Sequence, residues 1–286
     1  MECGTLYLVA TPIGNLNDMT YRAVDTLKNV DFIACEDTRH SLRLLNHFDI
    51  HKPLTSYFEH NKREKGEYII SRLKSGESAA LVTDAGTPAI SDPGEDLVRM
   101  CIEQNVKVVP VPGCAALINA LIVSGQDTGR FCFEGFLSVN KKSRSEHLAF
   151  LAGERRTMIF YEAPHKLRRT LDDMIRTFGG DRPVTLVREL TKLHEQIMCT
   201  TLSKAAQVYD GVSPKGEYVI VLAGMSEEQA ANKRKEEYSD ISIIQHVDRY
   251  ISGGMTKKDA IRETAKRRGL SRRDVYNEYE NGSKGV

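Results

Sequence analysis

Residues 79–94 read AALVTDAGTPAISDPG, a short apolar strand that runs directly into a long loop of small residues. A helix carrying Leu97, Val98 and Cys101 follows, so the loop is predicted at the carboxyl end of a strand, where open α/β sheets bind their ligands. Its two glycines and two prolines let the backbone approach a ligand closely while keeping the loop stiff. We therefore interpret residues 83–94 as the rim of a ligand site rather than as an elaborate turn.

Strands and helices alternate on both sides of this loop, which predicts a mostly parallel α/β sheet. The expected strands are residues 5–10, 32–35, a short stretch after Pro53, 79–83 and 106–111. After Pro112 and Gly113 a helix of small residues is expected at 114–124. Strands at 131–136, 157–161, 184–187, 195–200 and 217–222 then predict a second, mixed sheet.

The predicted organisation has four parts. An N-terminal α/β domain spans residues 1–112, and a second α/β domain spans residues 113–225. Residues 226–240 are almost devoid of aliphatic side chains and are expected to form a linker or a loose helix. Residues 241–286 contain three short amphipathic segments, the outline of a basic helix-turn-helix-like module.

Composition excludes several classes of protein. With 286 residues, 41% hydrophobic and 28% charged, the chain is neither disordered nor a disulfide scaffold. A net charge of +1 argues against a general coat for polyanions, although a local basic patch is compatible with it. The longest apolar run, residues 115–123, is half of the roughly 18 residues that span a bilayer. Because the N-terminus also lacks a signal peptide, we expect a cytoplasmic protein that does not bind membranes.

The six cysteines form no C-x-x-C pair and share no spacing with histidines, so they are expected to be reduced packing residues. No metal site is predicted. The chain also lacks G-x-G-x-x-G and G-x-x-x-x-G-K-[ST] patterns, which removes the usual dinucleotide-binding and P-loop proteins and favours a ligand without phosphates.

Three further turns have the same composition as the rim loop: residues 11–15, 112–116 and 161–165. Together with residues 84–94 and Lys215-Gly-Glu-Tyr-Val219, these turns resemble the tetrapyrrole methylase family over about residues 4–224. That resemblance implies two α/β domains with S-adenosylmethionine in the cleft between them. The segments 35–39, 83–94, 160–165 and 188–192 are more similar to the branch of the family that methylates ribosomal RNA. This branch implies transfer of a methyl group to the ribose 2′-hydroxyl of a cytidine in small-subunit ribosomal RNA.

Matching motif to motif, the resemblance implies cofactor contacts from every one of these turns. They are Pro12, Ile13, Asp84, Ala85, Gly86, Ala89, Ala115, Ala116, Tyr161, Glu162, Leu190 and Gly216. Small-molecule members of the family usually begin with a G-x-G-x-G-D-like turn, whereas this chain has Ala-Thr-Pro-Ile-Gly-Asn at residues 10–15. The difference argues against a porphyrin or corrin substrate.

Several polar residues at strand ends are candidates for the chemistry. A ribose hydroxyl is a weak nucleophile, so a nearby base would assist methyl transfer. The candidate bases are Glu36, Asp37, Glu162, His165 and Glu189, and Arg39 and Arg188 are candidates for holding an RNA phosphate. His165 also suits a helix cap and Glu189 also suits an ion pair with Arg188, and the sequence does not identify the base.

Basic residues crowd the C-terminal module, which is the electrostatic pattern of nucleic-acid binding. The predicted RNA contacts are Lys257, Lys258, Arg262, Lys266, Arg267, Arg268, Arg272 and Arg273, against only Asp259 and Glu263. Because no aromatic residue lies between Lys257 and Arg273, phosphate contacts are expected rather than base stacking.

Three functions follow from these observations. The first is S-adenosylmethionine-dependent methylation of ribosomal RNA within an assembling small subunit, and the resemblance implies a homodimer. The second is methylation of a porphyrin or corrin, which would not require the basic module, so deletion of residues 239–286 separates the two. The third is a nucleic-acid-binding regulator whose α/β body only senses a ligand, which turnover of the methyl donor would exclude.

Overall fold

The computed structural model describes residues 3–238 and 240–282. The ends of the predicted domains at residues 1–2 and 283–286, and Ser239 in the predicted linker, lie outside the described residues. The chain separates into two compact units: an α/β unit, Met1–Ala152 with Arg156–Ala223, and a C-terminal unit, Gly153–Arg155 with Gly224–Val286.

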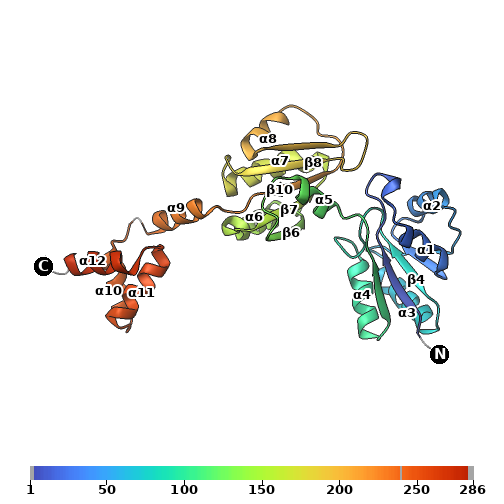
Figure 1. The fold of residues 1–286 in the computed structure, drawn as a ribbon, viewed down its shortest axis with the longest axis horizontal. Coiled ribbons are helices and arrows are strands. Elements are labelled where there is room, and N and C mark those ends of the chain that lie inside the picture. Colours follow the sequence, from blue (N-terminus) through green and yellow to red (C-terminus); the bar gives the residue numbers. More distant parts are fainter. Residues whose placement is uncertain (1–2, 239, 283–286) are drawn as a thin grey trace. The chain divides into compact units, whose positions relative to one another are not determined.

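A five-stranded parallel sheet occupies the N-terminal part of the α/β unit (Figure 1). Its strand order is β3-β2-β4-β1-β5, with β1 (Thr5–Val9), β2 (Phe32–Cys35), β3 (Leu54–Ser56), β4 (Ala79–Val82) and β5 (Lys107–Val111). Four helices connect the strands: α1 (Tyr21–Asn29), α2 (Thr38–His47), α3 (Lys62–Lys74) and α4 (Gly94–Glu103). The predicted strand–helix alternation is therefore confirmed.

Both faces of this sheet are covered, which explains why its central strands have no polar positions. β2 and β4 are buried at every residue, as expected for inner strands of a parallel sheet. Leu27 of α1 and Leu45 of α2 pack in one core cluster, and Ile69 of α3 and Leu97 of α4 pack in another. The N-terminal end of α1 is fixed by the predicted cap, since the Thr20 side chain accepts a hydrogen bond from the Ala23 N–H at 3.1 Å.

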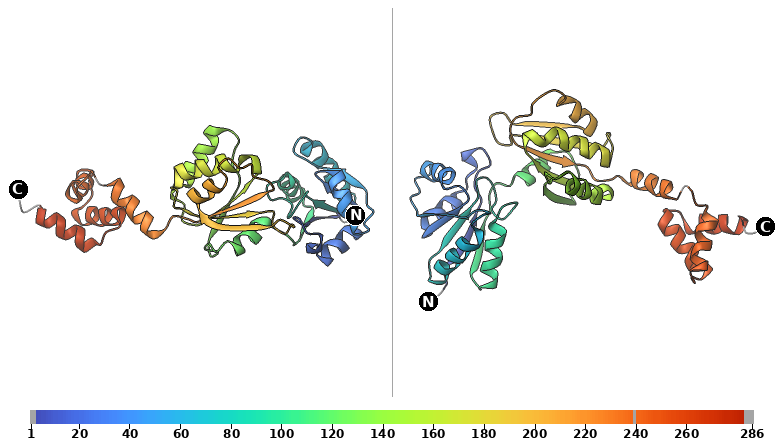
Figure 2. Two further views of the ribbon diagram at one scale, coloured as in Figure 1. Left: turned by 90° about the horizontal axis from the view of Figure 1, so that it is seen from above. Right: turned by 180° about the vertical axis from the view of Figure 1, so that it is seen from behind.

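A second sheet follows, and it is mixed as the sequence predicts. Its order is β6-β7-β10-β8-β9, with β6 (Phe131–Phe136), β7 (Thr157–Glu162), β8 (Pro183–Arg188), β9 (Gln196–Thr201) and β10 (Tyr218–Leu222). Only the β6–β7 pair is parallel. The helices are α5 (Ala116–Val123), α6 (Lys141–Phe150), α7 (Pro164–Phe178) and α8 (Leu202–Val208). α6, α7 and α8 contribute to the large core cluster, whereas α5 packs with Ile159, Val187 and Val221 in a separate, smaller one. Figure 2 shows the two sheets from other directions.

The C-terminal unit is a small helical module with its own core. It contains α9 (Glu227–Glu237), α10 (Ile243–Ser252), α11 (Lys257–Arg268) and α12 (Arg272–Gly282). The predicted linker region is thus helical over most of its length. Val247, Ala260, Ala265 and Val275 are buried together between α10, α11 and α12. α11 begins at the expected cap, where Thr256 accepts from the Asp259 N–H at 3.2 Å.

The cysteines depart in part from the prediction. All six are free thiols, and Cys35 and Cys101 are buried packing residues as expected. Cys3 and Cys199 are exposed, so the packing role is wrong for these two. Each lies near an end of the chain or on an edge strand, where neighbouring structure covers only one side.

Candidate functional site

The rim loop between β4 and α4 is held in an uncommon backbone conformation by one side chain. The Oδ1 atom of Asp92 accepts hydrogen bonds from the N–H groups of Ala89 (3.0 Å) and Gly94 (2.7 Å). Ala89 and Ser91 both have positive φ angles, 67° and 63°, which non-glycine residues adopt only when their surroundings fix them. The loop is therefore a preformed surface rather than a flexible connection.

The first turn of the chain is joined to this loop through backbone hydrogen bonds. The Thr11 N–H donates to the Gly86 carbonyl (2.9 Å), and the Gly86 N–H donates to the Thr11 carbonyl (3.1 Å). Gly86 has a φ of +83°, and a Cβ there would come within 3.2 Å of the Ile13 side chain. Glycine adopts this conformation without strain, and a larger residue would also press on Ile13.

The N-terminus of α5 forms a third wall, and a tyrosine from the mixed sheet completes its first turn. The N-cap residue of this helix, Ala115, has no side-chain atom that can accept a hydrogen bond from the first turn. Instead the Leu117 N–H donates to the Tyr161 hydroxyl at 3.1 Å. The Tyr161 ring is in turn held by edge contacts with Phe133 and Phe136. Small residues and available N–H groups at a helix N-terminus favour polar or anionic ligand groups.

These walls enclose a cavity of about 560 Å³, which is within the usual range for cofactor sites. Nine of the twelve predicted cofactor contacts line it: Ile13, Asp84, Ala85, Gly86, Ala115, Ala116, Tyr161, Glu162 and Leu190. Pro12, Ala89 and Gly216 do not line it. Pro12 is buried in the first turn, and the Ala89 N–H donates to Asp92. Gly216 lies against the Glu189 side chain. All three residues therefore contact or adjoin lining segments without lining the cavity themselves.

The cavity also has lining residues that the sequence did not single out. They include Thr87, Leu117, Phe136, Val187, Lys192 and Val219. Thr87 and Lys192 belong to segments already interpreted as functional, so only their side-chain direction was missed. Phe136, Val187 and Val219 are strand residues, and their positions follow from strand pairing that the sequence does not reveal.

The candidate bases differ in whether their side chains already make hydrogen bonds within the protein. Asp37 caps α2 by accepting from the N–H groups of Arg39 and His40, and these bonds lower the pKa of its carboxyl. Neither Asp37 nor the strongly exposed Arg39 lines the cavity. Glu162 lines it but is buried and committed to the Thr170 hydroxyl (2.6 Å) and the Ala163 N–H (2.9 Å).

Glu189 is also committed, though not to the partner suggested by the sequence. Its Oε1 atom accepts from the Glu217 N–H (3.0 Å) and from Lys192 Nζ (3.0 Å), and these bonds lower the pKa of the carboxyl. The expected pair with Arg188 is wrong, because the Arg188 side chain donates instead to the Lys215 carbonyl at 2.6 Å. Glu189 itself has a φ of 50°, so these contacts hold a strained turn at the edge of the cavity.

Glu36 and His165 remain as the two candidates that line the cavity without a side-chain hydrogen bond to any described residue. Glu36 follows β2 and is an exposed residue, although the cavity partly covers its carboxyl. Burial of the carboxyl, and the neighbouring carboxylates of Asp84 and Asp92, raise the pKa of Glu36. His165 lies in the first turn of α7. Both suit the handling of a proton at the mouth of the cavity.

The predicted RNA contacts of the C-terminal unit differ in whether they form ion pairs with acidic residues of the protein. Three form ion pairs: Lys257 with Glu280, Arg262 with Asp259, and Arg267 with Glu263. Four have no ion pair with any residue that the structure describes: Lys258, Lys266, Arg272 and Arg273.

Arg268 differs from the other cations of this unit. Its guanidinium donates to the Ile241 and Ser242 carbonyls and to the ring of His246, so it joins α11 to the start of α10. We assign it a structural role in place of the predicted RNA contact.

Among residues 3–238 and 240–282, no three His, Cys, Asp or Glu side chains come together in a way that suits a metal ion. In the same ranges, no helix has both the length and the apolar character needed to cross a bilayer.

Solved structures and sequenced relatives resemble this chain. A diphthine synthase superimposes with a TM-score of 0.59 at 13% identity, covering 79% of this chain and 92% of that chain. A uroporphyrin-III C-methyltransferase from Thermus thermophilus, solved with S-adenosyl homocysteine, gives 0.56 at 18% identity, covering 77% and 97%. At these identities the likeness establishes the fold.

Closer relatives span nearly the whole chain. A protein of Synechocystis named ribosomal RNA small subunit methyltransferase I is 47% identical over 273 residues, covering 96% of both chains. The protein of that name from Bacillus subtilis is 44% identical over 278 residues, covering 97% of this chain and 94% of the relative. The family model of the tetrapyrrole (corrin/porphyrin) methylases matches residues 5–206. The chain therefore belongs to the tetrapyrrole methylase family.

Proposed function

We propose that this protein is an S-adenosylmethionine-dependent methyltransferase that methylates a ribose 2′-hydroxyl of a cytidine in small-subunit ribosomal RNA. The observation that carries the proposal is the preformed cavity of the α/β unit, whose walls come from the sequence segments that resemble the ribosomal RNA branch of the family. The names of relatives that match nearly the full chain support the RNA substrate.

The residues of the cavity fit this methyl donor. Ala85, Gly86, Ala115 and Ala116 leave room beside the backbone for a nucleoside. The Oδ2 atom of Asp92 is buried without a hydrogen-bond partner, although its other oxygen is fully engaged. Such an unpaired buried acceptor suits the hydroxyl or amino groups of a ligand.

The chain's own residues have three tasks in the reaction. When bound, S-adenosylmethionine supplies a methyl group that is already activated by a sulfonium centre. The rigid rim and the α5 N-terminus orient the donor, and orientation alone contributes several kcal/mol in such reactions. As the ribose oxygen gains the methyl group it loses its proton, and we assign Glu36 as the acceptor because its carboxylate is made more basic by its surroundings. His165 is assigned to hydrogen bonding with the RNA at the cavity mouth.

The RNA is proposed to reach the enzyme within an assembling small ribosomal subunit in the cytoplasm. A homodimer is also proposed, with α5 and the mixed sheet as contact surfaces. Ile122 of α5 supports this, since its side chain is large, apolar and more than half exposed. Sedimentation at two protein concentrations, with Ile122→Ser as the disrupting variant, tests the dimer.

The function is tested by mapping a transferred label. The full-length protein is incubated with S-adenosylmethionine labelled in its methyl group and with small ribosomal subunits from cells that lack this enzyme. We expect label at a cytidine ribose of the small-subunit RNA, and none on fully modified subunits. Label on an added porphyrinoid instead, or no label on any RNA, would overturn the proposal.

A further inference from the structure

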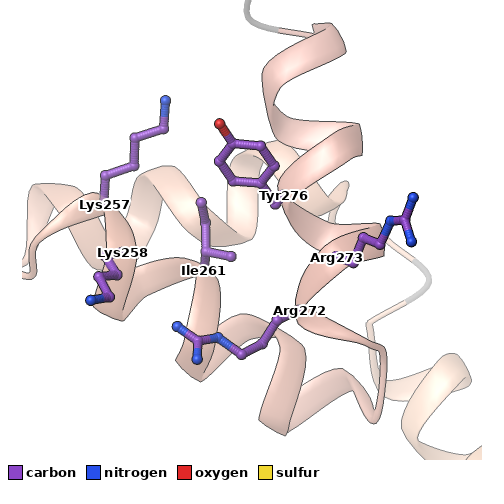
Figure 3. Close-up of a pocket in the computed structure, with 6 residues that line it drawn as sticks. All are labelled: Lys257, Lys258, Ile261, Arg272, Arg273 and Tyr276. Carbon is purple, nitrogen blue, oxygen red and sulfur yellow. The ribbon is translucent and has the colours of Figure 1, made fainter.

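The C-terminal unit contains a groove where the first turns of two helices meet (Figure 3). It has a volume of about 470 Å³. Its lining comes from α11 and α12: Lys257, Lys258, Ile261, Arg272, Arg273 and Tyr276. Four of the six side chains are cationic, and the other two are apolar or aromatic.

An exposed tyrosine ring stands in this cationic groove. Figure 3 shows the Tyr276 ring beside Ile261, with Lys257 on the same side and Arg272 extending toward Lys258. Tyr276 is 51% exposed, whereas Ile261 beneath the groove is buried. Within the described residues, Tyr276 contacts no other aromatic ring and makes no hydrogen bond through its hydroxyl. About half of this aromatic side chain is thus open to a ligand.

The charge of the groove is mostly uncompensated. Lys258, Arg272 and Arg273 have no acidic partner in the part of the chain that the structure describes, and only Lys257 is paired, with Glu280 at 2.5 Å. Lys257 and Arg272 are also the first residues of α11 and α12. Thr256 and Ser271 each accept one N–H of these first turns, which also carry Asp259 and Asp274. The N–H groups left without an acceptor within the helix add to the positive potential. Phosphate groups suit this combination.

We propose that this groove binds a single-stranded segment of RNA, with one base stacked on Tyr276 and the neighbouring phosphates held by Lys258 and Arg272. An unpaired base is required, because a base within a duplex already has both faces covered by its neighbours. The proposal deepens the proposed function, on which it rests, by assigning the class of RNA structure that the C-terminal unit recognises. It adds a base contact to the expected phosphate contacts, because an aromatic residue lies just beyond the basic segment 257–273.

The test uses the full-length protein and a short oligoribonucleotide that contains one 2-aminopurine, a base whose fluorescence falls when it stacks. The chain contains no tryptophan, so the probe signal stands clear of protein emission. We expect saturable quenching by the wild type with the single strand, and little with the same strand in a duplex. Tyr276→Ala is expected to weaken binding about tenfold and to abolish the quenching at saturation. Tyr276→Phe, which keeps the ring, should retain both.

Charge variants distinguish stacking from electrostatic attraction. The double variant Lys258→Gln/Arg272→Gln is expected to weaken binding and to reduce the salt dependence of the affinity by about two phosphate contacts. The quenching at saturation should persist, because the ring remains. Lys28→Gln, an exposed lysine of α1, is the control and should change neither quantity.

Clear outcomes would overturn the inference. If Tyr276→Ala, shown by circular dichroism to be folded, quenches the probe as the wild type does, the base does not stack there. A Tyr276→Phe variant as weak as Tyr276→Ala, or equal binding of duplex and single strand, would also contradict stacking. If these results occur while the wild type labels ribosomal RNA, this inference fails and the proposed function stands. If stacking is observed but no RNA is methylated, the proposed function fails instead.

Discussion

The cavity of the α/β unit and the groove of the C-terminal unit are formed by different kinds of chemical group. Backbone groups and very small side chains form much of the cavity, and hydrogen bonds such as those of Thr11 and Asp92 hold them in place. The groove is built from long charged side chains on two helices around one tyrosine. A site of the first kind should recognise one small molecule with defined geometry, whereas a site of the second kind should bind a polyanion with many weak, adaptable contacts. Loss of a single charge should therefore be mild in the C-terminal unit, whereas substitutions at the proton acceptor and in the backbone of the cavity should be severe.

The largest effect is expected at the proposed proton acceptor. Glu36→Gln keeps the size of the side chain but removes the base, so we expect kcat to fall roughly 100-fold or more. Donor affinity should change little. Asp37→Asn, one residue away and outside the cavity, is the comparison, and its kcat should stay well above that of Glu36→Gln. Equal losses in the two variants would mean that position 36 acts through structure and not through proton transfer.

The same assignment predicts a pH dependence. Because its surroundings raise the pKa of Glu36, the carboxylate takes up its proton at a higher pH than an ordinary glutamate does. Methyl transfer should therefore decline on acidification, starting above the usual glutamate range, since the base is lost as pH falls through its pKa. The acidic limb should vanish from the pH–rate profile of Glu36→Gln, and its persistence there would assign the limb to another group.

A backbone substitution in the cavity should come next in size. Gly86→Ala places a Cβ against Ile13 and forces alanine to a φ of +83°, so we expect donor affinity to fall about tenfold or more, or about 1.4 kcal/mol. Gly211→Ala is the matched control: it has a φ of +67° but open space around the new Cβ. Calorimetry should show normal donor binding in the control. A comparable loss of donor affinity in both variants would mean that backbone strain, and not the contact with Ile13, weakens binding.

A smaller effect is expected where one hydroxyl completes the α5 N-terminus. Tyr161→Phe leaves the Leu117 N–H without its acceptor, which costs about 1 kcal/mol and should weaken donor binding about fivefold. Tyr7→Phe removes a hydroxyl for which the described residues offer no hydrogen-bond partner, and donor affinity should stay unchanged. If both variants bind the donor normally, the helix terminus does not contact it.

The smallest single-residue effects should come from isolated charges of the C-terminal unit. Lys266→Gln removes one unpaired cation outside the groove, so RNA affinity should fall only a few-fold, about 1 kcal/mol or less per contact, with a slightly reduced salt slope. Filter binding at several salt concentrations measures both quantities. A loss of RNA affinity as large as the roughly 100-fold loss of kcat expected for Glu36→Gln would contradict binding through many weak contacts.

The sequence was sufficient for the order of elements because their signals are local. Apolar runs such as 32–35 and 131–136 coincide with β2 and β6, and the Thr20 and Thr256 caps lie where the residue types predict them. Most cavity-lining residues were also predictable, since they follow strands directly. What local signals omit is pairing across the chain. Tyr161 pairs with Phe136 and with Val219, and Val219 pairs with Val187, and these pairings bring Phe136 and Val187 to the same cavity.

Two residues of the C-terminal unit show what helical spacing adds to a count of charges. Arg268 was counted as an RNA contact, yet it follows Ile261, Thr264 and Ala265 at the spacing of one helical face, and that face is buried. Tyr276, the proposed stacking residue, lies four residues after Arg272 and so shares a face with it on α12. The number of charges along a segment does not show which face of the helix carries them, and recognition depends on that face.

The most direct test of this account is a calorimetric titration of the full-length protein with S-adenosylhomocysteine, the uncharged-sulfur product, at low and high salt. A cavity built from backbone and small side chains should bind one molecule per chain with the same Kd in both buffers, while RNA affinity measured alongside falls steeply with salt. Absence of any binding heat from well-folded protein, or a Kd that weakens with salt as the RNA affinity does, would contradict the account.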